Sequence, residues 1–379
     1  MNSSHVKIAA DIIAKSDREH PADSVLRLEL KRQKNLARED SRQISRAVFN
    51  YFRWFGWLDT TKAVAGNLFA AEELGERFAR DPQRISDAEL AAKAVPAWTK
   101  ENVQVSPEWL RALQVEPKLW LRAKRNQSKR IADALGFSLR ETETQLDDAI
   151  EYRGTEDLFR SPEFQNGDFE LQDISSQAVS VACAPQPGET WWDACAGEGG
   201  KLLHLSELMQ NKGLIWASDR AEWRLKKLKQ RAARGKVFNY RAALWDGGKK
   251  LPTKTKFDGV LVDAPCSGIG TWQRNPHARW NTAAQDVAEL GELQKNLLSN
   301  AADSVKPGGK LIYSVCTLSR GETDDIADFF DQSQKNFTPL ALQNPFGKTE
   351  SASRLWFWPQ NTGGNGMFVA GWRKNTANT

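Results

Sequence analysis

Two cysteines each end an apolar run that is typical of a buried strand. Cys266 closes the segment 257–266, which ends in Asp-Ala-Pro-Cys, and Cys316 follows the apolar run 310–315. Open α/β sheets bind ligands beyond the carboxyl ends of their strands, so we expect both thiols to face one crevice. A thiolate can attack a substrate and later be expelled, and Asp263 would project into the same crevice. A single strand-end cysteine is equally well explained as a small buried apolar residue, whereas two with Asp and Pro at these spacings favour chemistry.

A glycine-rich turn after another apolar run predicts a cofactor site. Residues 193–204 read DACAGEGGKLLH, and their small side chains let the backbone approach a nucleotide-type ligand closely. Asp219 ends the next predicted strand, roughly 20 residues on, where a carboxylate can accept hydrogen bonds from ribose hydroxyls. Dehydrogenases use the same arrangement, but Leu202 stands at the place of their third glycine, and Glu198 would repel a diphosphate. The turn therefore favours a cofactor without phosphate groups, such as S-adenosylmethionine, over NAD, and an ordinary tight turn is the alternative.

The composition is that of a globular protein with more than one domain. A chain of 379 residues is too long for one ordinary core. No apolar run approaches the roughly 18 residues that span a membrane, and the N-terminus does not resemble a secretory signal. Four cysteines without CxxC pairs argue against a zinc site and against disulfides. We therefore expect a cytoplasmic protein with no metal and no membrane partner, and a monomer is its expected state.

Basic residues are concentrated in two segments. Residues 220–241 contain nine Lys or Arg and one Glu, and residues 118–130 contain six Lys or Arg, no acid and Trp120. The whole chain has a net charge of +5. Basic clusters with an aromatic residue fit a nucleic-acid partner and strongly salt-dependent binding. The alternative for either cluster is a solvated helix face.

Residues 1–110 are predicted to be helical. Within residues 41–59, apolar residues recur at three- and four-residue spacing and predict an amphipathic helix. Arg42, Arg46 and Arg53 lie largely off its apolar face. The region is therefore either an RNA-docking bundle that uses these arginines or an ordinary helical bundle.

Residues 111–175 are predicted to form short, mixed elements, and from about residue 176 strands and helices alternate. Such alternation predicts a doubly wound, mostly parallel α/β sheet with helices on both faces, here with an antiparallel edge strand near the C-terminus. The predicted strands are 190–193, 213–218, 236–240, 257–263, 310–315 and 366–374, and the predicted helices are 200–211, 221–234 and 284–304.

Several segments, in one order, resemble the Nop/Sun family of RNA cytosine-5 methyltransferases, close to its bacterial RsmB-type members. The segments are LQDISSQAV (171–179), DACAGEGGK (193–201), DAPCSGIGTWQRNPHARW (263–280), LGELQKNLLSNA (290–301) and VCTLSRGE (315–322). The first 110 residues are similar to the NusB-like helical RNA-binding domain of that group. The resemblance implies a Rossmann-like class I methyltransferase domain at 176–375, preceded by the helical domain at 1–110 and a small α+β RNA-facing subdomain at 111–175.

The resemblance also implies roles for individual residues in methylation of an RNA cytosine. Cys316 would be the nucleophile, Cys266 would assist release of the methylated RNA, and Asp263 would hold the target base. Lys201 would pair with Asp263 and tune it. S-adenosylmethionine would be held by Cys195, Ala196, Gly197, Glu198, Gly199, Gly200, Lys201, Asp219, Arg224, Asp246 and Asp263.

Departures from the family pattern leave other interpretations open. The family's cofactor loop usually reads Ala-Pro-Gly-Gly-Lys, whereas Gly197 and Glu198 precede Gly-Gly-Lys here. Arg224 is also explained as a surface arginine, and Asp246 as a turn residue before two glycines. A non-catalytic RNA-binding assembly factor with a vestigial cofactor pocket would explain the altered loop, but it has no chemical need for both cysteines. Ribosomal RNA is the expected substrate, transfer RNA is the alternative, and the target base must be unstacked.

Overall fold

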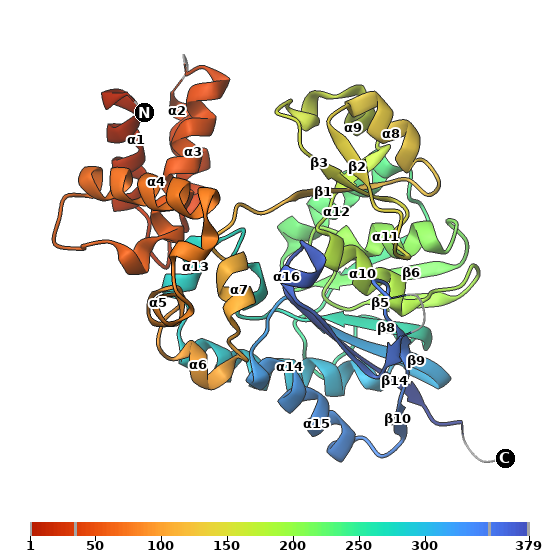
Figure 1. The fold of residues 1–379 in the computed structure, drawn as a ribbon. Coiled ribbons are helices and arrows are strands. Elements are labelled where there is room, and N and C mark those ends of the chain that lie inside the picture. The colour runs from red at the N-terminus through yellow and green to blue at the C-terminus, as the bar shows by residue number, and fades with distance from the viewer. Residues whose placement is uncertain (1, 34–35, 348–349, 377–379) are drawn as a thin grey trace. The chain divides into compact units, whose positions relative to one another are not determined.

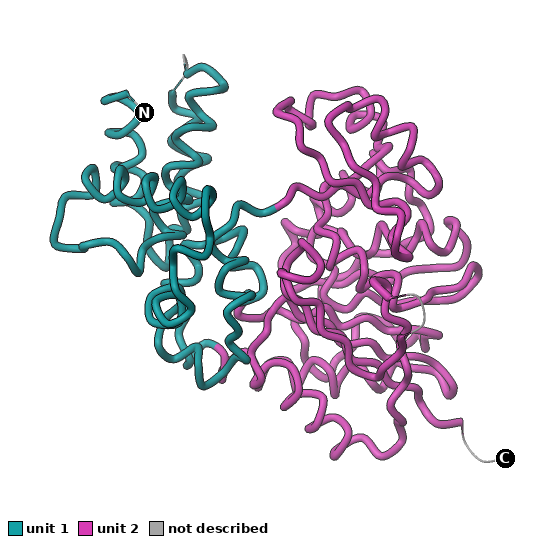
Figure 2. Tube along the Cα trace, viewed as in Figure 1, with its two compact units in different colours: residues 1–117, 268–286 teal, residues 118–267, 287–379 magenta. Residues whose placement is uncertain are grey.

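The computed structural model describes residues 2–33, 36–347 and 350–376, and its chain divides into two compact units. The first unit consists of residues 1–117 and 268–286, and the second of residues 118–267 and 287–379 (Figure 2). The chain therefore leaves the second unit after Ser267 and re-enters it at Val287.

The first unit is helical, as the sequence predicted. Its longer helices are α1 (Ser3–Ala14), α2 (Ala22–Arg32), α3 (Arg38–Arg53) and α4 (Val64–Arg80), followed by the shorter α5 (Asp87–Lys93), α6 (Thr99–Asn102) and α7 (Pro107–Ala112). The predicted amphipathic segment 41–59 forms most of α3 and the 3-10 turn η1 (Phe55–Trp57). Ile44, Val48 and Phe52 of α3 are buried in a core that they share with α1, α2 and α4.

Residues 268–286 pack inside the helical unit, where they form η4 (Ile269–Thr271), α13 (Pro276–Asn281) and the first turn of α14 (Ala284–Ala302) (Figure 1). Arg279 on α13 is fully buried, and its guanidinium donates to the carbonyls of Ala94 at 2.9 Å and Leu113 at 3.0 Å. Burial lowers the pKa of Arg279 to about 9. The Trp280 indole donates to the carbonyl of Phe52 at 2.7 Å. This segment is thus an integral part of the helical core.

The second unit begins with a small antiparallel sheet of four strands in the order β2-β3-β1-β4. Its strands are β1 (Leu119–Ala123), β2 (Ser138–Arg140), β3 (Ala149–Tyr152) and β4 (Phe169–Leu171), and the helices α8 (Ser128–Leu135) and α9 (Pro162–Gln165) accompany them. Ile131 of α8 and Phe164 of α9 are buried against strand residues such as Leu121 and Ile150.

A larger, eight-stranded sheet forms the rest of the second unit, with the order β10-β14-β9-β8-β5-β6-β7 and β13 also paired to β14. The strands are β5 (Thr190–Asp193), β6 (Leu214–Asp219), β7 (Tyr240–Leu244), β8 (Phe257–Asp263), β9 (Val305–Val315), β10 (Phe337–Pro339), β13 (Arg354–Phe357) and β14 (Met367–Lys374). Pairing among β5–β9 is parallel, and β14 runs antiparallel to β9. The predicted doubly wound, mostly parallel fold is confirmed.

Helices cover both faces of this sheet because alternate strand residues point to opposite sides. Trp191 of β5 belongs to a core that includes residues of α10 (Ile174–Cys183), α11 (Gly200–Leu208) and α12 (Glu222–Gly235). Trp192 belongs to the opposite core, which includes residues of α14 and α15 (Asp324–Ser333). The remaining short elements are η3 (Leu158–Arg160), η5 (Arg320–Glu322), α16 (Pro359–Thr362), β11 (Leu342–Gln343) and β12 (Ser351–Ala352). Among the described residues, no helix combines the length and apolarity needed to cross a membrane.

Two details of the predicted sheet were wrong. The strand predicted at 236–240 begins only at Tyr240, because α12 continues to Gly235 and Lys236 then takes a left-handed conformation with φ of 58°. The apolar side chain of Phe238 misled the prediction, since it is 77% exposed. The antiparallel strand predicted at the edge, β14, is not outermost, because β10 and β13 pair with it.

Candidate active site

The carboxyl ends of four parallel strands open onto one cavity of about 400 Å³, a size within the usual range of ligand sites. Asp193 ends β5, Asp219 ends β6 and Asp263 ends β8, while Cys316 follows β9. Twelve of the predicted site residues line the cavity, namely Cys195, Ala196, Gly197, Glu198, Gly200, Lys201, Asp219, Arg224, Asp246, Asp263, Cys266 and Cys316.

Among the described residues, Gly199 was also predicted to belong to the site, but it does not line the cavity. Its backbone has a φ of 87° at the start of α11, and an added Cβ would lie 2.8 Å from Cγ of Leu228. The position therefore needs glycine for its left-handed backbone and its contact with α12, rather than for a ligand.

The glycine loop leaves room for a ligand at Gly197. A Cβ added there would meet no atom within 4 Å, although the residue lines the cavity. The Gly197 amide donates to Oδ2 of Asp219 at 3.1 Å, and the Ala221 amide donates to Oδ1 at 2.8 Å. Arg224 lies 3.7 Å from Asp219 Oδ2. The backbone thus fixes the Asp219 carboxylate at the mouth of the loop.

Glu198, the unusual residue of the loop, is paired with α12. Its carboxylate lies 2.8 Å from the Lys227 ammonium, and its carbonyl accepts from Arg231 at 3.1 Å. The ion pair balances the charge that distinguishes this loop from the family pattern.

The lining fits S-adenosylmethionine better than a diphosphate. Five acidic side chains, those of Asp193, Glu198, Asp219, Asp246 and Asp263, line the cavity. Such a set suits the ammonium, sulfonium and ribose hydroxyl groups of S-adenosylmethionine, and it would repel phosphate groups. Leu293 and Leu297 supply an apolar part of the lining that an adenine ring can contact.

Asp193 is a residue that the sequence analysis did not include in the site. Its side chain is 1% exposed, and neither carboxylate oxygen has a hydrogen-bond partner of ordinary geometry. Burial, with the nearby charge of Asp263, raises the pKa of Asp193 to about 8. A buried carboxylate in this state is typical of a functional site rather than of a stable core.

A buried ion pair joins the cofactor loop to β8. The Lys201 ammonium donates to Oδ2 of Asp263 at 2.7 Å, and the Ser314 hydroxyl donates to Oδ1 at 2.7 Å. Burial by itself would lower the pKa of Lys201, but attraction and hydrogen bonding to Asp263 outweigh it and raise the pKa. The predicted pairing of Lys201 with Asp263 is therefore present, and Ser314 is a partner that the sequence did not reveal.

The two predicted catalytic thiols touch. The Sγ atoms of Cys266 and Cys316 lie 3.3 Å apart. A hydrogen bond from Cys266 lowers the pKa of Cys316, and Lys201 helps, against burial and the charge of Asp263. Burial raises the pKa of the Cys183 thiol to about 12 and also raises that of Cys195. Of these three cysteines, Cys316 is the one whose surroundings favour the thiolate, the nucleophilic form.

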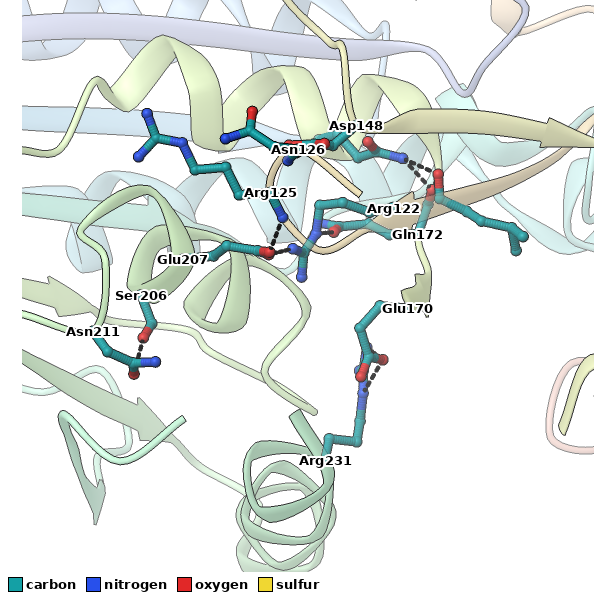
Figure 3. A network of polar contacts seen from close by, with 12 residues as sticks. Arg122, Arg125, Asn126, Asp148, Glu170, Gln172, Ser206, Glu207, Asn211 and Arg231 are labelled. Atoms are coloured by element: carbon teal, nitrogen blue, oxygen red, sulfur yellow. Dashed lines mark hydrogen bonds and ion pairs between the residues drawn. The ribbon is translucent and has the colours of Figure 1, made fainter. Parts of the chain in front are cut away.

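Three of the six basic side chains at 118–130 form ion pairs within the second unit, namely Arg122 with Glu207 (Figure 3), Lys118 with Glu151 and Arg130 with Asp168. Arg122 is buried, forms an ion pair with Glu207 of α11, and donates to Gln172 at 2.7 Å. In the other cluster, Arg231 and Arg234 of α12 both pair with Glu170 of β4. Trp120 is buried too, so it does not stack on a ligand. These side chains tie the small sheet to the large one.

Asp219→Asn is expected to weaken S-adenosylmethionine binding by about 10- to 100-fold, because the carboxylate that we expect to accept hydrogen bonds from the ribose hydroxyls loses its charge. Isothermal titration with S-adenosylmethionine measures the change. Asp258→Asn is the matched control, since Asp258 is the second residue of β8, lies at the opposite end of the strand from Asp263 and pairs with Lys306. Equal affinity in both variants would contradict the assignment of Asp219.

Comparison with known proteins identifies relatives of this chain. The chain is 38% identical over 221 residues to the probable ribosomal RNA small subunit methyltransferase B of Bacillus subtilis, covering 56% of this chain and 49% of that protein. It is 35% identical over 192 residues to the mouse tRNA (cytosine(72)-C(5))-methyltransferase NSUN6, covering 46% of this chain and 40% of that protein. The matched part of the chain thus spans about half, or less than half, of the length of each of these curated relatives.

The fold as a whole also has a solved counterpart. The crystal structure of PH0851 superimposes with a TM-score of 0.81 over 99% of both chains at 22% sequence identity. Residues 180–373, about half of the chain, match the family described as 16S rRNA methyltransferase RsmB/F. The chain belongs to this RsmB/F, or Nop/Sun, family of RNA cytosine-C5 methyltransferases, whose methyl donor is S-adenosylmethionine.

Proposed function

We propose that this protein transfers a methyl group from S-adenosylmethionine to C5 of a cytosine in ribosomal RNA. The observation that carries the proposal is the contact between the sulfur atoms of Cys266 and Cys316, 3.3 Å apart, in a cavity that the cofactor loop also lines. The lowered pKa of Cys316, for which the hydrogen bond from Cys266 is the main cause, supports its role as nucleophile.

The proposed reaction answers a specific chemical difficulty, because C5 of cytosine is a poor nucleophile. The Cys316 thiolate adds to C6 and forms a carbon–sulfur bond, which makes C5 electron-rich. S-adenosylmethionine would supply the electrophilic methyl group for the new bond to C5, and its sulfonium sulfur would keep the electron pair of the broken methyl–sulfur bond. Cys266 gives up its own proton to solvent and, as thiolate, takes the C5 proton; the C6–sulfur bond then breaks, and Cys316 is expelled as thiolate. Asp263, oriented by Lys201 and Ser314, would hold the N3/N4 edge of the base.

Ribosomal RNA is preferred as substrate because the family description and the Bacillus subtilis relative both name ribosomal RNA. Transfer RNA stays the alternative, since the NSUN6 relative is named for it. A non-catalytic assembly factor would need neither the thiol contact nor the buried Lys201–Asp263 pair. Chemistry with free thiols requires reducing conditions, so the cytoplasm stays the expected location.

The decisive experiment compares RNA from cells with and without this protein by bisulfite sequencing, which detects 5-methylcytosine. Loss of one or a few ribosomal RNA sites is the expected result. Loss of methylation confined to transfer RNA would mean that transfer RNA, not ribosomal RNA, is the substrate. Unchanged methylation of all RNA, together with no binding of S-adenosylmethionine in titration, would favour the assembly factor.

We propose that the helical unit, predicted from the sequence as residues 1–110, binds RNA. The binding surface would be a groove along α3 that is lined by arginines, called here the arginine groove. The groove has a volume of about 590 Å³ and is lined by Arg38, Arg42, Arg46, Arg53 and Arg274, with Phe49, Glu39 and Glu116 among its other residues. Arg42 and Arg46 are at most weakly held, by exposed ion pairs with Glu39 at 3.3 Å and Glu116 at 3.2 Å. Phosphate oxygens of an RNA strand would compete well for such arginines.

Arg42→Gln/Arg46→Gln is expected to weaken RNA binding and to flatten its salt dependence. Two lost phosphate contacts reduce the slope of log Kd against log salt by about 1.4 to 1.8. Filter binding at several salt concentrations measures the slope. Arg77→Gln/Arg80→Gln, on the exposed last turn of α4, is the matched control and should keep the wild-type slope. An unchanged slope in the groove variant would show that RNA binds elsewhere.

A further inference from the structure

A buried carboxylate contacts the chain next to both cysteines. Glu322 ends the short turn η5, and its side chain is 0% exposed. Burial raises the pKa of Glu322, while hydrogen bonds from Ser267, Gln294 and Thr317 oppose the rise. Because burying a carboxylate costs free energy unless it is well hydrogen-bonded, mere filling of space does not explain the choice of glutamate.

Both carboxylate oxygens bind residues that immediately follow the cysteines. The Ser267 amide donates to Oε1 of Glu322 at 2.8 Å, and the Thr317 hydroxyl donates to Oε2 at 3.1 Å. The Ser267 hydroxyl also donates to Oε2 and lies 2.9 Å from the Thr317 hydroxyl. Since Ser267 follows Cys266 and Thr317 follows Cys316, one side chain joins the exits of β8 and β9.

The glutamate is itself held in place by two fully buried side chains. Gln294 of α14 donates to Oε1 of Glu322 at 3.0 Å and to the Pro265 carbonyl at 2.9 Å. The Tyr313 hydroxyl lies 2.8 Å from the Glu322 carbonyl and 2.9 Å from Oε1 of Gln294. The network therefore holds Pro265 and Ser267, on either side of Cys266, and Thr317, which follows Cys316.

We propose that Glu322 is a positioning residue that clamps the two strand exits together and so keeps the Cys266 and Cys316 sulfur atoms in contact. The clamp deepens, and rests on, the proposed two-cysteine reaction. Pairing of β8 with β9 fixes the two strands as far as Asp263 and Ser314. Both cysteines lie beyond the paired residues, where the shared carboxylate holds the two exits together.

The carboxylate also acts on Cys316 through its charge. The hydrogen bond from Cys266 lowers the pKa of Cys316, whereas the negative charge of Glu322 acts in the opposite direction. Glu322→Gln removes the charge but keeps an oxygen for the Ser267 amide. Glu322→Ala removes the clamp altogether. The two variants therefore separate position from charge.

Cross-linking of the full-length protein by dibromobimane, which fluoresces when it bridges two nearby thiols, reports sulfur proximity without RNA or cofactor. Glu322→Ala should cross-link Cys266 to Cys316 much more slowly than the wild type, and Glu322→Gln should cross-link at close to the wild-type rate. The pH profile of Cys316 alkylation, followed by mass spectrometry of its peptide, should move to lower pH in Glu322→Gln. Thr323→Val, a neighbouring buried threonine whose hydroxyl bonds to the Ser319 carbonyl, is the control and should match the wild type.

In methylation assays, Glu322→Ala should lower kcat on the order of 10²-fold, as expected for misplaced reacting groups, with RNA and S-adenosylmethionine affinities unchanged. A general loss of structure would lower the affinities as well. If Glu322→Ala does not fold, Thr317→Val cuts one arm of the clamp at nearly constant volume and should also slow cross-linking. Wild-type cross-linking rates in a folded Glu322→Ala, or in Thr317→Val, would overturn the clamp. A wild-type protein that cross-links normally but methylates no RNA would instead overturn the proposed function.

Discussion

Replacing Cys316 with serine is expected to lower methyl transfer on the order of 10⁴-fold or more, because the variant loses the group that forms the covalent bond to the base. A serine hydroxyl is far less acidic than a thiol, and the hydrogen bond from Cys266 that lowers the pKa of Cys316 cannot make it a comparable nucleophile. Transfer of a radioactive methyl group to RNA measures the rate. RNA that contains 5-fluorocytosine, which lacks a removable C5 proton, should trap a covalent adduct with the wild type and none with Cys316→Ser.

Cys183→Ala provides the control for this experiment. Cys183 ends α10 in the core, is fully buried, and has a thiol whose pKa burial raises to about 12. Its loss should leave the adduct intact. If Cys316→Ser still formed the adduct, the nucleophile would have to be another residue.

The main features of the active site could be predicted because each depends on short stretches of sequence. An apolar run followed by small residues defines where β5 ends, and an apolar run followed by Pro-Cys defines where β8 ends. Parallel strands bring these ends to one edge of the sheet whatever lies between them. The structure accordingly brings Lys201, Asp263, Cys266 and Cys316 to one cavity.

Residues that depend on distant partners could not be predicted in the same way. Asp193 looks like the last residue of a strand, and only the folded structure reveals that its carboxylate is buried without ordinary partners. Glu322 lies 55 residues from Ser267, so its contact follows from the fold rather than from local spacing. Arg122 was included in a cluster predicted to bind RNA, because its partner Glu207 is 85 residues away and the contact cannot be read from the sequence.

The path of residues 268–286 shows the same limit. The segment begins two residues after Cys266, within the region that the sequence predicted to be the methyltransferase domain. Arg279 instead donates to carbonyls of Ala94 and Leu113, residues that the sequence analysis assigned to the helical region or its border. A buried guanidinium that satisfies main-chain carbonyls has no signature in sequence, since it depends on helix ends that meet only in the folded unit.

Replacing Cys266 with alanine is expected to give the opposite signature to Cys316→Ser. The Cys316 thiolate can still add to cytosine, but no thiolate at position 266 remains to take the C5 proton, so the methylated RNA is not released. Denaturing gels should show a protein–RNA adduct that accumulates with unmodified RNA and S-adenosylmethionine, without 5-fluorocytosine. Turnover should fall by about 10²- to 10⁴-fold, the usual contribution of a positioned acid or base.

The pH dependence of adduct formation tests the second role of Cys266. Its hydrogen bond is the main cause of the lowered pKa of Cys316, so its removal should raise that pKa. At a pH near 7 a smaller fraction of Cys316 is then thiolate, and adduct forms more slowly in Cys266→Ala, with its rate recovering as the pH rises. Single-turnover measurements across pH should therefore place the inflection at higher pH than in the wild type, whereas Cys183→Ala should keep the wild-type profile. Normal turnover with an unshifted profile in Cys266→Ala would mean that the sulfur contact has no part in the reaction, and the two-cysteine assignment would have to be given up.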